Sequence, residues 1–251
     1  MSGHSKWSSI KHKKGAADAK RGQLFSKLSK AIIVAAKQGG GDPMNNLSLQ
    51  NAIEKAKSYS MPRDNIDRAI AKGSGADADA DAFESITYEG YGPEGVAVIV
   101  EALTDNKNRT AADVRHLFAK HGGNLGTDGS VSWQFERRGV VVVAAEGVDE
   151  DELFKAAADG GADDIELDGS VFQITAAPEQ FAAVRGAVES AGFTVESSEL
   201  MLVPKTTIAV DDEAKARQVM RLVDALEEND DVQDVYANFD IPEQVLEMVA
   251  G

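Results

Sequence analysis

The residues best suited to chemistry in this sequence are cationic side chains close to its beginning. Six of them fall within sixteen residues, with Asp18 as the only acidic residue among them. Such a run can neutralise phosphates of a nucleic acid and release counterions, which gives affinity without reading base sequence. The alternative is a solvated lysine-rich terminus that merely aids solubility. The six residues are Lys6, Lys11, Lys13, Lys14, Lys20 and Arg21.

An aromatic residue and two imidazoles accompany these cations. Trp7 could stack on an unpaired base or a sugar, although an amphipathic anchor against the first helix explains it equally well. His4 and His12 could add hydrogen-bond donors to phosphate. No helix-turn-helix or zinc finger is recognisable, so this arm is expected to read backbone and shape rather than bases.

A second polar cluster, Asp105–Thr110, joins a buried-type strand to a helix. Polar side chains at a strand end and a helix N-terminus suit contact with an anion or a nucleic-acid backbone. Helix capping by Asn or Asp, with Arg109 solvated, is the alternative. The candidate contact residues here are Asn106, Lys107 and Arg109.

No arrangement for catalysis or metal binding is visible in the sequence. The absence of cysteine excludes disulfides, thiolate catalysis and cysteine-ligated zinc. His116 and His121 lack a metal-motif glutamate between them, and no nucleophile elbow or Walker loop occurs. The Asp-x-Asp-x-Asp run from Asp77 lacks the glycine and glutamate of a calcium loop. We therefore expect a non-enzymatic protein with no catalytic residue, metal, cofactor or small-molecule substrate.

The charges are distributed unevenly along the chain. Residues 1–72 hold 14 Lys+Arg against 5 Asp+Glu, a net of +9, although the whole chain has a net charge of −16. The remainder holds 12 basic and 37 acidic residues, a net of −25. This asymmetry is typical of a nucleic-acid-binding arm on an acidic body. The body would repel phosphate and so orient the encounter.

Residues 1–72 are predicted to form a helical domain. Leu24, Leu28 and Ile32 recur at helical spacing, and a neighbouring face of the same helix gathers further cations. Lys27 and Lys30 on that face join the candidate contact residues.

Glycine and proline punctuate this domain. Gly39–Gly41 ends the first helix, and Asp42 with Pro43 suits the start of a second. Pro62 opens a third helix, and Gly73 follows its end. The low-complexity acidic residues that come next are interpreted as a linker.

Beyond the linker the periodicity changes to mixed strands and helices. A buried-type strand at 96–103, a helix at 107–121 and an alternating strand containing Val131, Trp133 and Phe135 come first. Residues 138–204 then follow a β-α-β-β-α-β order, which matches a ferredoxin-like unit. A helix at 212–227 and a strand at 232–236 remain, and the simplest arrangement has this tail completing the first unit.

These elements predict an α+β fold with a helical N-terminal domain followed by two α/β (ferredoxin-like) domains, the third inserted in the second. The predicted parts are a basic helical domain at 1–72, an acidic linker at 73–84, a discontinuous domain at 85–137 plus 205–251, and an insertion at 138–204.

The sequence favours a cytoplasmic location. No stretch approaches the roughly 18 uncharged apolar residues of a membrane span, so no membrane partner is expected. The N-terminus has no apolar segment typical of a secretory signal, and the lack of cysteine fits a reducing compartment.

Several blocks in order along the chain resemble the YebC family. That family's pattern implies the three-domain architecture given above, and it favours a binding role for the Asp105–Thr110 cluster. The most distinctive blocks are Gly3–Trp7, Met61–Ile70, Ala102–Thr110, Gly122–Gly126 and Gly129–Phe135.

The resemblance implies a regulator of gene expression but leaves its target open. Bacterial members are usually called probable transcriptional regulatory proteins that bind DNA. A mitochondrial relative is a translational activator, and some bacterial relatives are linked to helping ribosomes through difficult sequences. The expected partner is therefore duplex DNA or ribosomal RNA on the ribosome. A protein-interaction module that uses the acidic domains as a docking surface is a third possibility.

Overall fold

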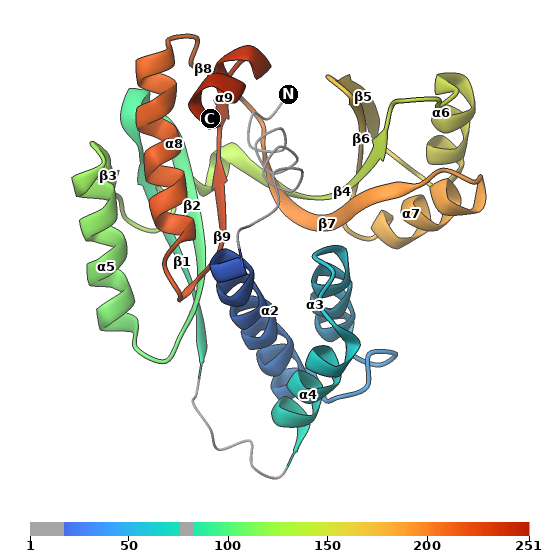
Figure 1. Ribbon diagram of the computed structural model, residues 1–251, viewed down its shortest axis with the longest axis horizontal. Helices are drawn as coiled ribbons and strands as arrows, with labels where there is room; N and C mark the ends of the chain where they lie inside the picture. The colour runs from blue at the N-terminus through green and yellow to red at the C-terminus, as the bar shows by residue number, and fades with distance from the viewer. Residues whose placement is uncertain (1–17, 76–82, 251) are drawn as a thin grey trace. The chain divides into compact units, whose positions relative to one another are not determined.

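The computed structural model describes residues 18–75 and 83–250 (Figure 1). Among them are two compact units. The first contains the described residues up to Phe135 together with those from Pro204 onward, and the second is Glu136–Val203. The finer division into a helical domain, a linker, a discontinuous domain and an insertion stays a prediction.

Three helices begin the first unit and surround a core of their own. They are α2 (Asp18–Gly39), α3 (Leu47–Ser58) and α4 (Arg63–Ser74). The apolar stripe predicted for the first helix faces this core, because Leu28 and Ile32 are buried there. Burial of side chains from all three helices stabilises the bundle, since short helices are marginal in water by themselves. The other buried members include Leu49, Ile53, Met61 and Ile66.

Two helix ends differ from the sequence-based prediction. The side chain of Asn46, rather than Asp42, caps α3, where its Oδ1 accepts a hydrogen bond from the N–H of Leu49 at 3.1 Å. Gly73 lies inside α4 instead of following it. A Cβ at this position would lie 2.4 Å from the carbonyl oxygen of Ile33, so glycine is needed for α4 to approach α2 closely.

A four-stranded sheet forms the rest of the first unit, in the order β3-β1-β2-β9. The neighbouring strands are all antiparallel. The last strand comes from the end of the chain, and its pairing places Ala237 opposite Val98. The four strands are β1 (Glu84–Tyr91), β2 (Ala97–Thr104), β3 (Asn124–Leu125) and β9 (Val232–Ala237).

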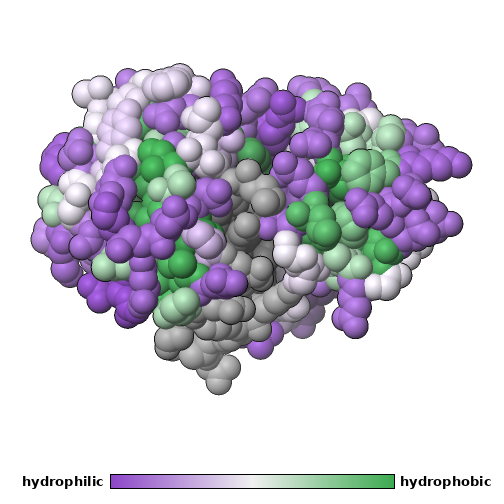
Figure 2. All heavy atoms as spheres, turned by 90° about the horizontal axis from the view of Figure 1, so that it is seen from above, coloured by the Kyte–Doolittle hydropathy of each residue, from purple (hydrophilic) through white to green (hydrophobic). Residues whose placement is uncertain are grey.

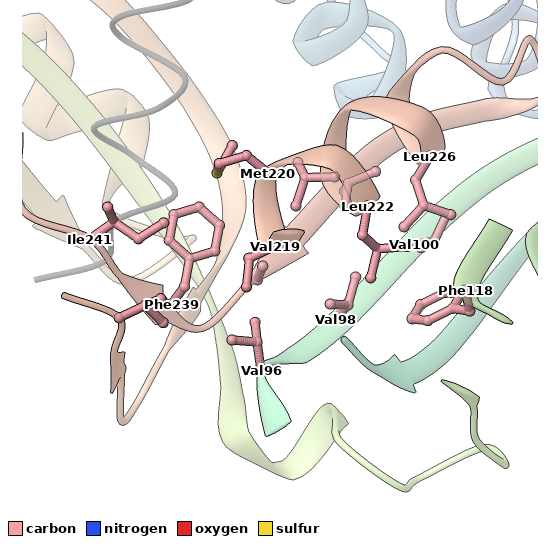
Figure 3. Packing of buried hydrophobic residues seen from close by; sticks show 14 of the residues in the cluster. Val96, Val98, Val100, Phe118, Val219, Met220, Leu222, Leu226, Phe239 and Ile241 are labelled. Carbon is pink, nitrogen blue, oxygen red and sulfur yellow. The ribbon is translucent and has the colours of Figure 1, made fainter. Parts of the chain in front are cut away.

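Helices α5 (Lys107–Lys120) and α8 (Glu213–Glu227) pack on this sheet. Figure 3 shows the core that they enclose, in which Val98 and Val100 of β2 meet Phe118 of α5 and several side chains of α8. All of these residues are fully buried. A short β8 (Ile208–Ala209) and β10 (Phe239–Asp240) pair in parallel, and α9 (Glu243–Ala250) adds Leu246 to the same core.

The expected alternating strand through Val131, Trp133 and Phe135 is wrong. Residues Ser132–Gln134 form one turn of 3-10 helix, η2, and β4 (Phe135–Ala144) begins only after it. Because such a turn rotates each residue by a third of a revolution, side chains two apart no longer share a face. Val131 and Phe135 are buried, whereas Trp133 points outward and is 65% exposed.

The second unit contains the predicted β-α-β-β-α-β order. Its sheet has the order β5-β6-β4-β7, as in a ferredoxin-like unit, and two helices share a core with it. The predicted α+β class is confirmed. The elements after β4 are α6 (Glu150–Asp159), β5 (Asp164–Asp168), β6 (Val171–Ala176), α7 (Phe181–Ser190) and β7 (Val195–Pro204).

The face seen in Figure 2 is covered mainly by hydrophilic residues, with hydrophobic ones gathered in separate patches. Among the helices of residues 18–75 and 83–250, none has the length and hydropathy needed to cross a membrane.

Candidate nucleic-acid interface

Most of the predicted arm lies outside the described residues. Lys6, Trp7, Lys11, His12, Lys13 and Lys14 all precede them, and Lys20 falls in the first turn of α2, where only the backbone is described. Arg21 is the first predicted contact residue with a described side chain. It is exposed, and its guanidinium carbon lies 5.4 Å from the centroid of the Phe25 ring, which holds the cation at the helix surface.

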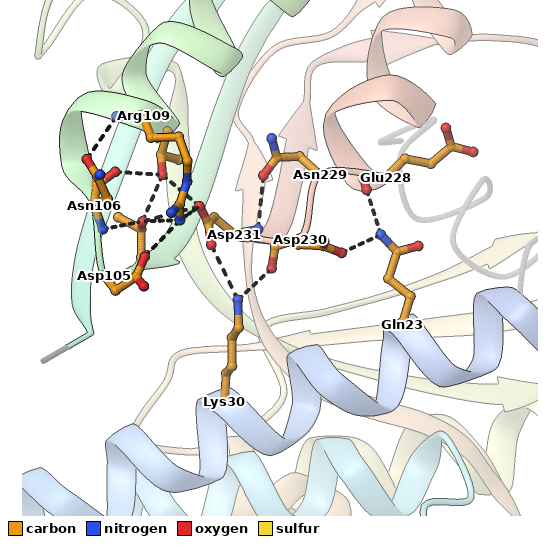
Figure 4. Close-up of polar contacts among 11 residues, drawn as sticks. Gln23, Lys30, Asp105, Asn106, Arg109, Glu228, Asn229, Asp230 and Asp231 are labelled. Atoms are coloured by element: carbon orange, nitrogen blue, oxygen red, sulfur yellow. Dashed lines mark hydrogen bonds and ion pairs between the residues drawn. The ribbon is translucent and has the colours of Figure 1, made fainter. Parts of the chain in front are cut away.

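The lysine face of α2 lies against the loop between α8 and β9 (Figure 4). Lys27 is 8% exposed, and its Nζ donates a hydrogen bond to the carbonyl oxygen of Glu227 at 2.5 Å. The Nζ of Lys30 donates to the carbonyl oxygen of Asp230 at 3.0 Å and lies 3.3 Å from a carboxylate oxygen of Asp231. These two candidate residues therefore connect the helices to the acidic part of the same unit.

Asp231 is the centre of this polar contact. Its Oδ2 accepts hydrogen bonds from Arg109 at 2.7 Å, Thr110 at 2.8 Å and Thr104 at 3.2 Å. Burial by itself would raise the pKa of Asp231, but the hydrogen bonds from Arg109, Thr110 and Lys30 outweigh it, so the pKa is lowered. The carboxylate is thus held as an anion between two cations.

The Asp105–Thr110 cluster mainly caps a helix and binds this carboxylate. Asn106 caps α5, because its Oδ1 accepts from the N–H of Arg109 at 3.1 Å. Lys107 forms an ion pair with Glu84. Arg109 pairs with Asp231 at 2.7 Å and Asp105 at 2.8 Å, and hydrogen bonds to these two carboxylates raise its pKa. The capping interpretation of Asn106 is confirmed, while Arg109 is paired rather than simply solvated.

The structure thus brings together Lys30 and Arg109, two candidate residues from distant parts of the sequence. It also shows contacts that the sequence did not indicate. Gln23 donates to the carbonyl oxygen of Glu228 at 2.6 Å, and Lys55 forms an ion pair with Asp234. The adjacent acidic residues Asp230 and Asp231 before β9 are evident in the sequence, but nothing in the sequence indicates which residues, some 200 positions away, they contact.

A second buried carboxylate, Glu89 of β1, holds the loop 126–134. Its oxygens accept hydrogen bonds from the backbone N–H groups of Gly129, Val131 and Ser132, each at 2.8 Å. Burial acts to raise the pKa of Glu89, but these backbone hydrogen bonds outweigh it and lower the pKa. This carboxylate fixes the backbone that carries Trp133.

Neither carboxylate is placed for proton transfer, since donors of the protein itself occupy both. Among the described residues, no group of three or more His, Asp or Glu side chains could hold a metal ion. The hydrogen bonds to Asp231 and Glu89 fit a structural role for both carboxylates.

The fold and these clusters define a multidomain α+β protein whose helical part is tied by cations to an acidic body. Two family models match it: the TACO1/YebC protein N-terminal domain over residues 5–76, and the TACO1/YebC second and third domain over residues 83–239. The chain belongs to the TACO1/YebC family.

Similar proteins cover the full length of the chain. A protein of Rubrobacter xylanophilus is 59% identical over 100% of both chains, and one of Syntrophus aciditrophicus is 51% identical over 100% of both. Each is called a probable transcriptional regulatory protein, which supports a regulatory role. The crystal structure of a conserved hypothetical protein from Aquifex aeolicus matches with a TM-score of 0.80 and 49% identity, covering 90% of this chain and 93% of that one.

Proposed function

We propose that this protein is a nucleic-acid-binding regulator of gene expression that acts without catalysis. The observation that carries the proposal is the charge division, a net of +9 in residues 1–72 against −25 in the remainder. Clustered lysines supply phosphate contacts and release counterions, while the acidic body keeps other surfaces away from phosphate. Such a regulator would act in the cytoplasm.

The contact residues in this proposal are the N-terminal cations with Trp7 and His12, supported by the Asn106–Arg109 segment. Lys30 and Arg109 are already bound to the carboxylate of Asp231 in the structure, so Asp231 competes with phosphate for both cations. Lys27 likewise donates to a backbone carbonyl. The arm itself, Lys6 to Arg21, is therefore proposed to make the first contacts.

Duplex DNA is the first candidate target. The relatives' name, probable transcriptional regulatory protein, favours it. A regulator of transcription also needs base discrimination, which groove contacts provide at about 1–3 kcal/mol for each base pair.

Structured RNA on the ribosome is the second candidate, and the lack of a recognisable helix-turn-helix or zinc finger favours it. Lys27 and Lys30 of α2 are engaged by the loop before β9, so recognition is assigned to the arm. An arm that binds backbone and shape is better suited to folded RNA, whose deep major groove side chains cannot read.

The deciding experiment compares both targets with the full-length protein. We expect binding to duplex DNA and to a folded ribosomal RNA fragment at low salt, and a steep loss of affinity at roughly 0.3 M salt. Sedimentation with ribosomes and little sequence preference on DNA would support the RNA target. Tight binding to one DNA site, without ribosome association, would support the transcriptional target. Salt-independent behaviour, or no nucleic-acid binding at low salt, would contradict the proposal.

A further inference from the structure

Trp133 stands out among the exposed side chains of the described residues. Most large apolar side chains there are buried, yet this indole is 65% exposed. Single exposed apolar residues are common on proteins, so exposure alone indicates nothing. Two further features distinguish Trp133: the hydrogen bonds that fix its loop, and the charged residue that contacts its backbone.

The ring is held in place by its own loop. Its Nε1–H donates a hydrogen bond to the carbonyl oxygen of Ser130 at 3.1 Å, and the hydroxyl of Tyr91 donates to the same oxygen at 3.1 Å. Glu89 fixes the backbone on either side of that carbonyl through the N–H groups of Gly129 and Val131. The indole N–H thus already has a hydrogen-bond acceptor, and the loop is ordered before a ligand binds. This order lowers the entropic cost of binding.

A cation lies against the backbone of the same residue. The Nζ of Lys205 donates a hydrogen bond to the carbonyl oxygen of Trp133 at 3.2 Å, and its backbone N–H donates to the carbonyl oxygen of Gln134 at 2.8 Å. In the loop 126–134, Asp128 is the only charged residue. The exposed indole and the ammonium of Lys205 are therefore attached to the same short stretch of backbone, in a loop where Asp128 is the only charged residue.

We propose that Trp133 and Lys205 form a stacking site for an unpaired nucleobase, with the ammonium placed toward the phosphate of the same nucleotide. The indole offers an exposed aromatic surface while its N–H is already bonded, so recognition rests on stacking, which tolerates any base. This inference depends on the proposed function and deepens it. The site would select single-stranded segments, such as RNA loops or melted DNA, over continuous duplex.

The two tryptophans of the chain allow a direct test. In the full-length Trp7→Phe variant, Trp133 is the only tryptophan, so its emission reports on this loop alone. We expect single-stranded oligouridine to quench the emission, and a blunt duplex to leave it nearly unchanged. The corresponding single-stranded oligodeoxynucleotide distinguishes an RNA source from a DNA source of the same chemistry, and quenching by either one supports the site.

Affinity measurements in the otherwise unchanged protein provide the second readout. Trp133→Ala should weaken binding of the single strand by about 5- to 150-fold, as expected for loss of one stacked base, while Trp133→Phe keeps most of the affinity. Lys205→Ala should lower the dependence of log affinity on log salt by about 0.7, the value for one phosphate contact on a single strand. Phe154→Ala removes another exposed aromatic residue, which is 42% exposed, and should change neither quantity.

The stacking site is refuted if Trp133→Ala binds the single strand as tightly as Phe154→Ala does. Quenching of equal size by the blunt duplex would contradict it too. If the Trp7→Phe variant binds through its arm while the Trp133 emission stays constant, the stacking site alone fails. If it binds no nucleic acid at all, the proposed function fails as well.

Discussion

Replacement of Asp231 by Asn tests how the helices are held to the sheet of the first unit. The change removes the negative charge that Arg109 and Lys30 share, and it leaves one acceptor oxygen where Asp231 has two. Hydrogen bonds to charged groups contribute about 1.5–3 kcal/mol each. The side chain of Asp231 is only 9% exposed, but that of Arg109 is 48% exposed, so solvent weakens their pair. We expect the free energy of unfolding to fall by about 2–4 kcal/mol.

Urea unfolding followed by circular dichroism measures this loss, with Asp230→Asn as the matched control. Asp230 is the exposed neighbour, and its replacement should change stability by no more than about 0.5 kcal/mol. Because the pKa of Asp231 is lowered in the folded protein, its contribution is complete above its unfolded pKa of about 3.9 and is lost as pH falls through the folded value. The difference between Asp231→Asn and the unchanged protein should therefore shrink below about pH 4. If Asp231→Asn and Asp230→Asn are equally stable at pH 7, the argument is refuted.

Three further predictions concern the same unit. Asp231→Asn should also raise affinity for duplex DNA and steepen its salt dependence by up to about 1.8, because it removes the carboxylate that competes with phosphate for two cations, each worth about 0.9; an unchanged slope would exclude Lys30 and Arg109 from the interface. Glu89→Gln should loosen the loop 126–134, since one of the two oxygens that accept from its backbone N–H groups is replaced by a donor amide; a blue shift or no change of Trp133 emission in the Trp7→Phe background, where a red shift is expected, would contradict this. Gly73→Ala should destabilise the unit by about 1–3 kcal/mol, because the added methyl group would overpack against the carbonyl of Ile33. Gly22→Ala, whose added Cβ would meet nothing within 4 Å, should stabilise the unit by up to about 1 kcal/mol. If thermal unfolding ranks the two variants in the opposite order, the packing argument is contradicted.

The elements that the sequence predicted well are those with a long apolar period. The helices after Lys107 and Asp212 and the buried strand from Val96 carry such patterns, and the structure has them within a residue or two. Strand β1, Glu84–Tyr91, is absent from the sequence-based prediction because its two buried positions are Glu89 and Gly90, which give no apolar signal, and its other residues are exposed or half-buried. The short β3, β8 and β10 depend on pairing with distant segments, which periodicity does not report.

The candidate site shows the same limit. Charge counting identified the lysines of α2, but it could not show that Lys27 and Lys30 bind the loop before β9. A cation looks the same in sequence whether its partner is phosphate or a carboxylate of its own chain. Trp133 illustrates the opposite case. Its alternation with Val131 and Phe135 predicted that all three side chains share one buried face, but the 3-10 turn directs the Trp133 side chain outward.

The salt dependence of nucleic-acid binding by the arm tests the central proposal most directly. Full-length protein and a variant with Lys11, Lys13, Lys14 and Lys20 replaced by Glu are titrated with the same duplex DNA and the same folded RNA between 50 and about 300 mM salt. We expect the variant to lose binding at moderate salt, and any residual slope on DNA to fall by at least about 3.6, or about 0.9 for each lysine. An unchanged affinity and slope, with both units still folded, would show that the basic arm is not the nucleic-acid interface.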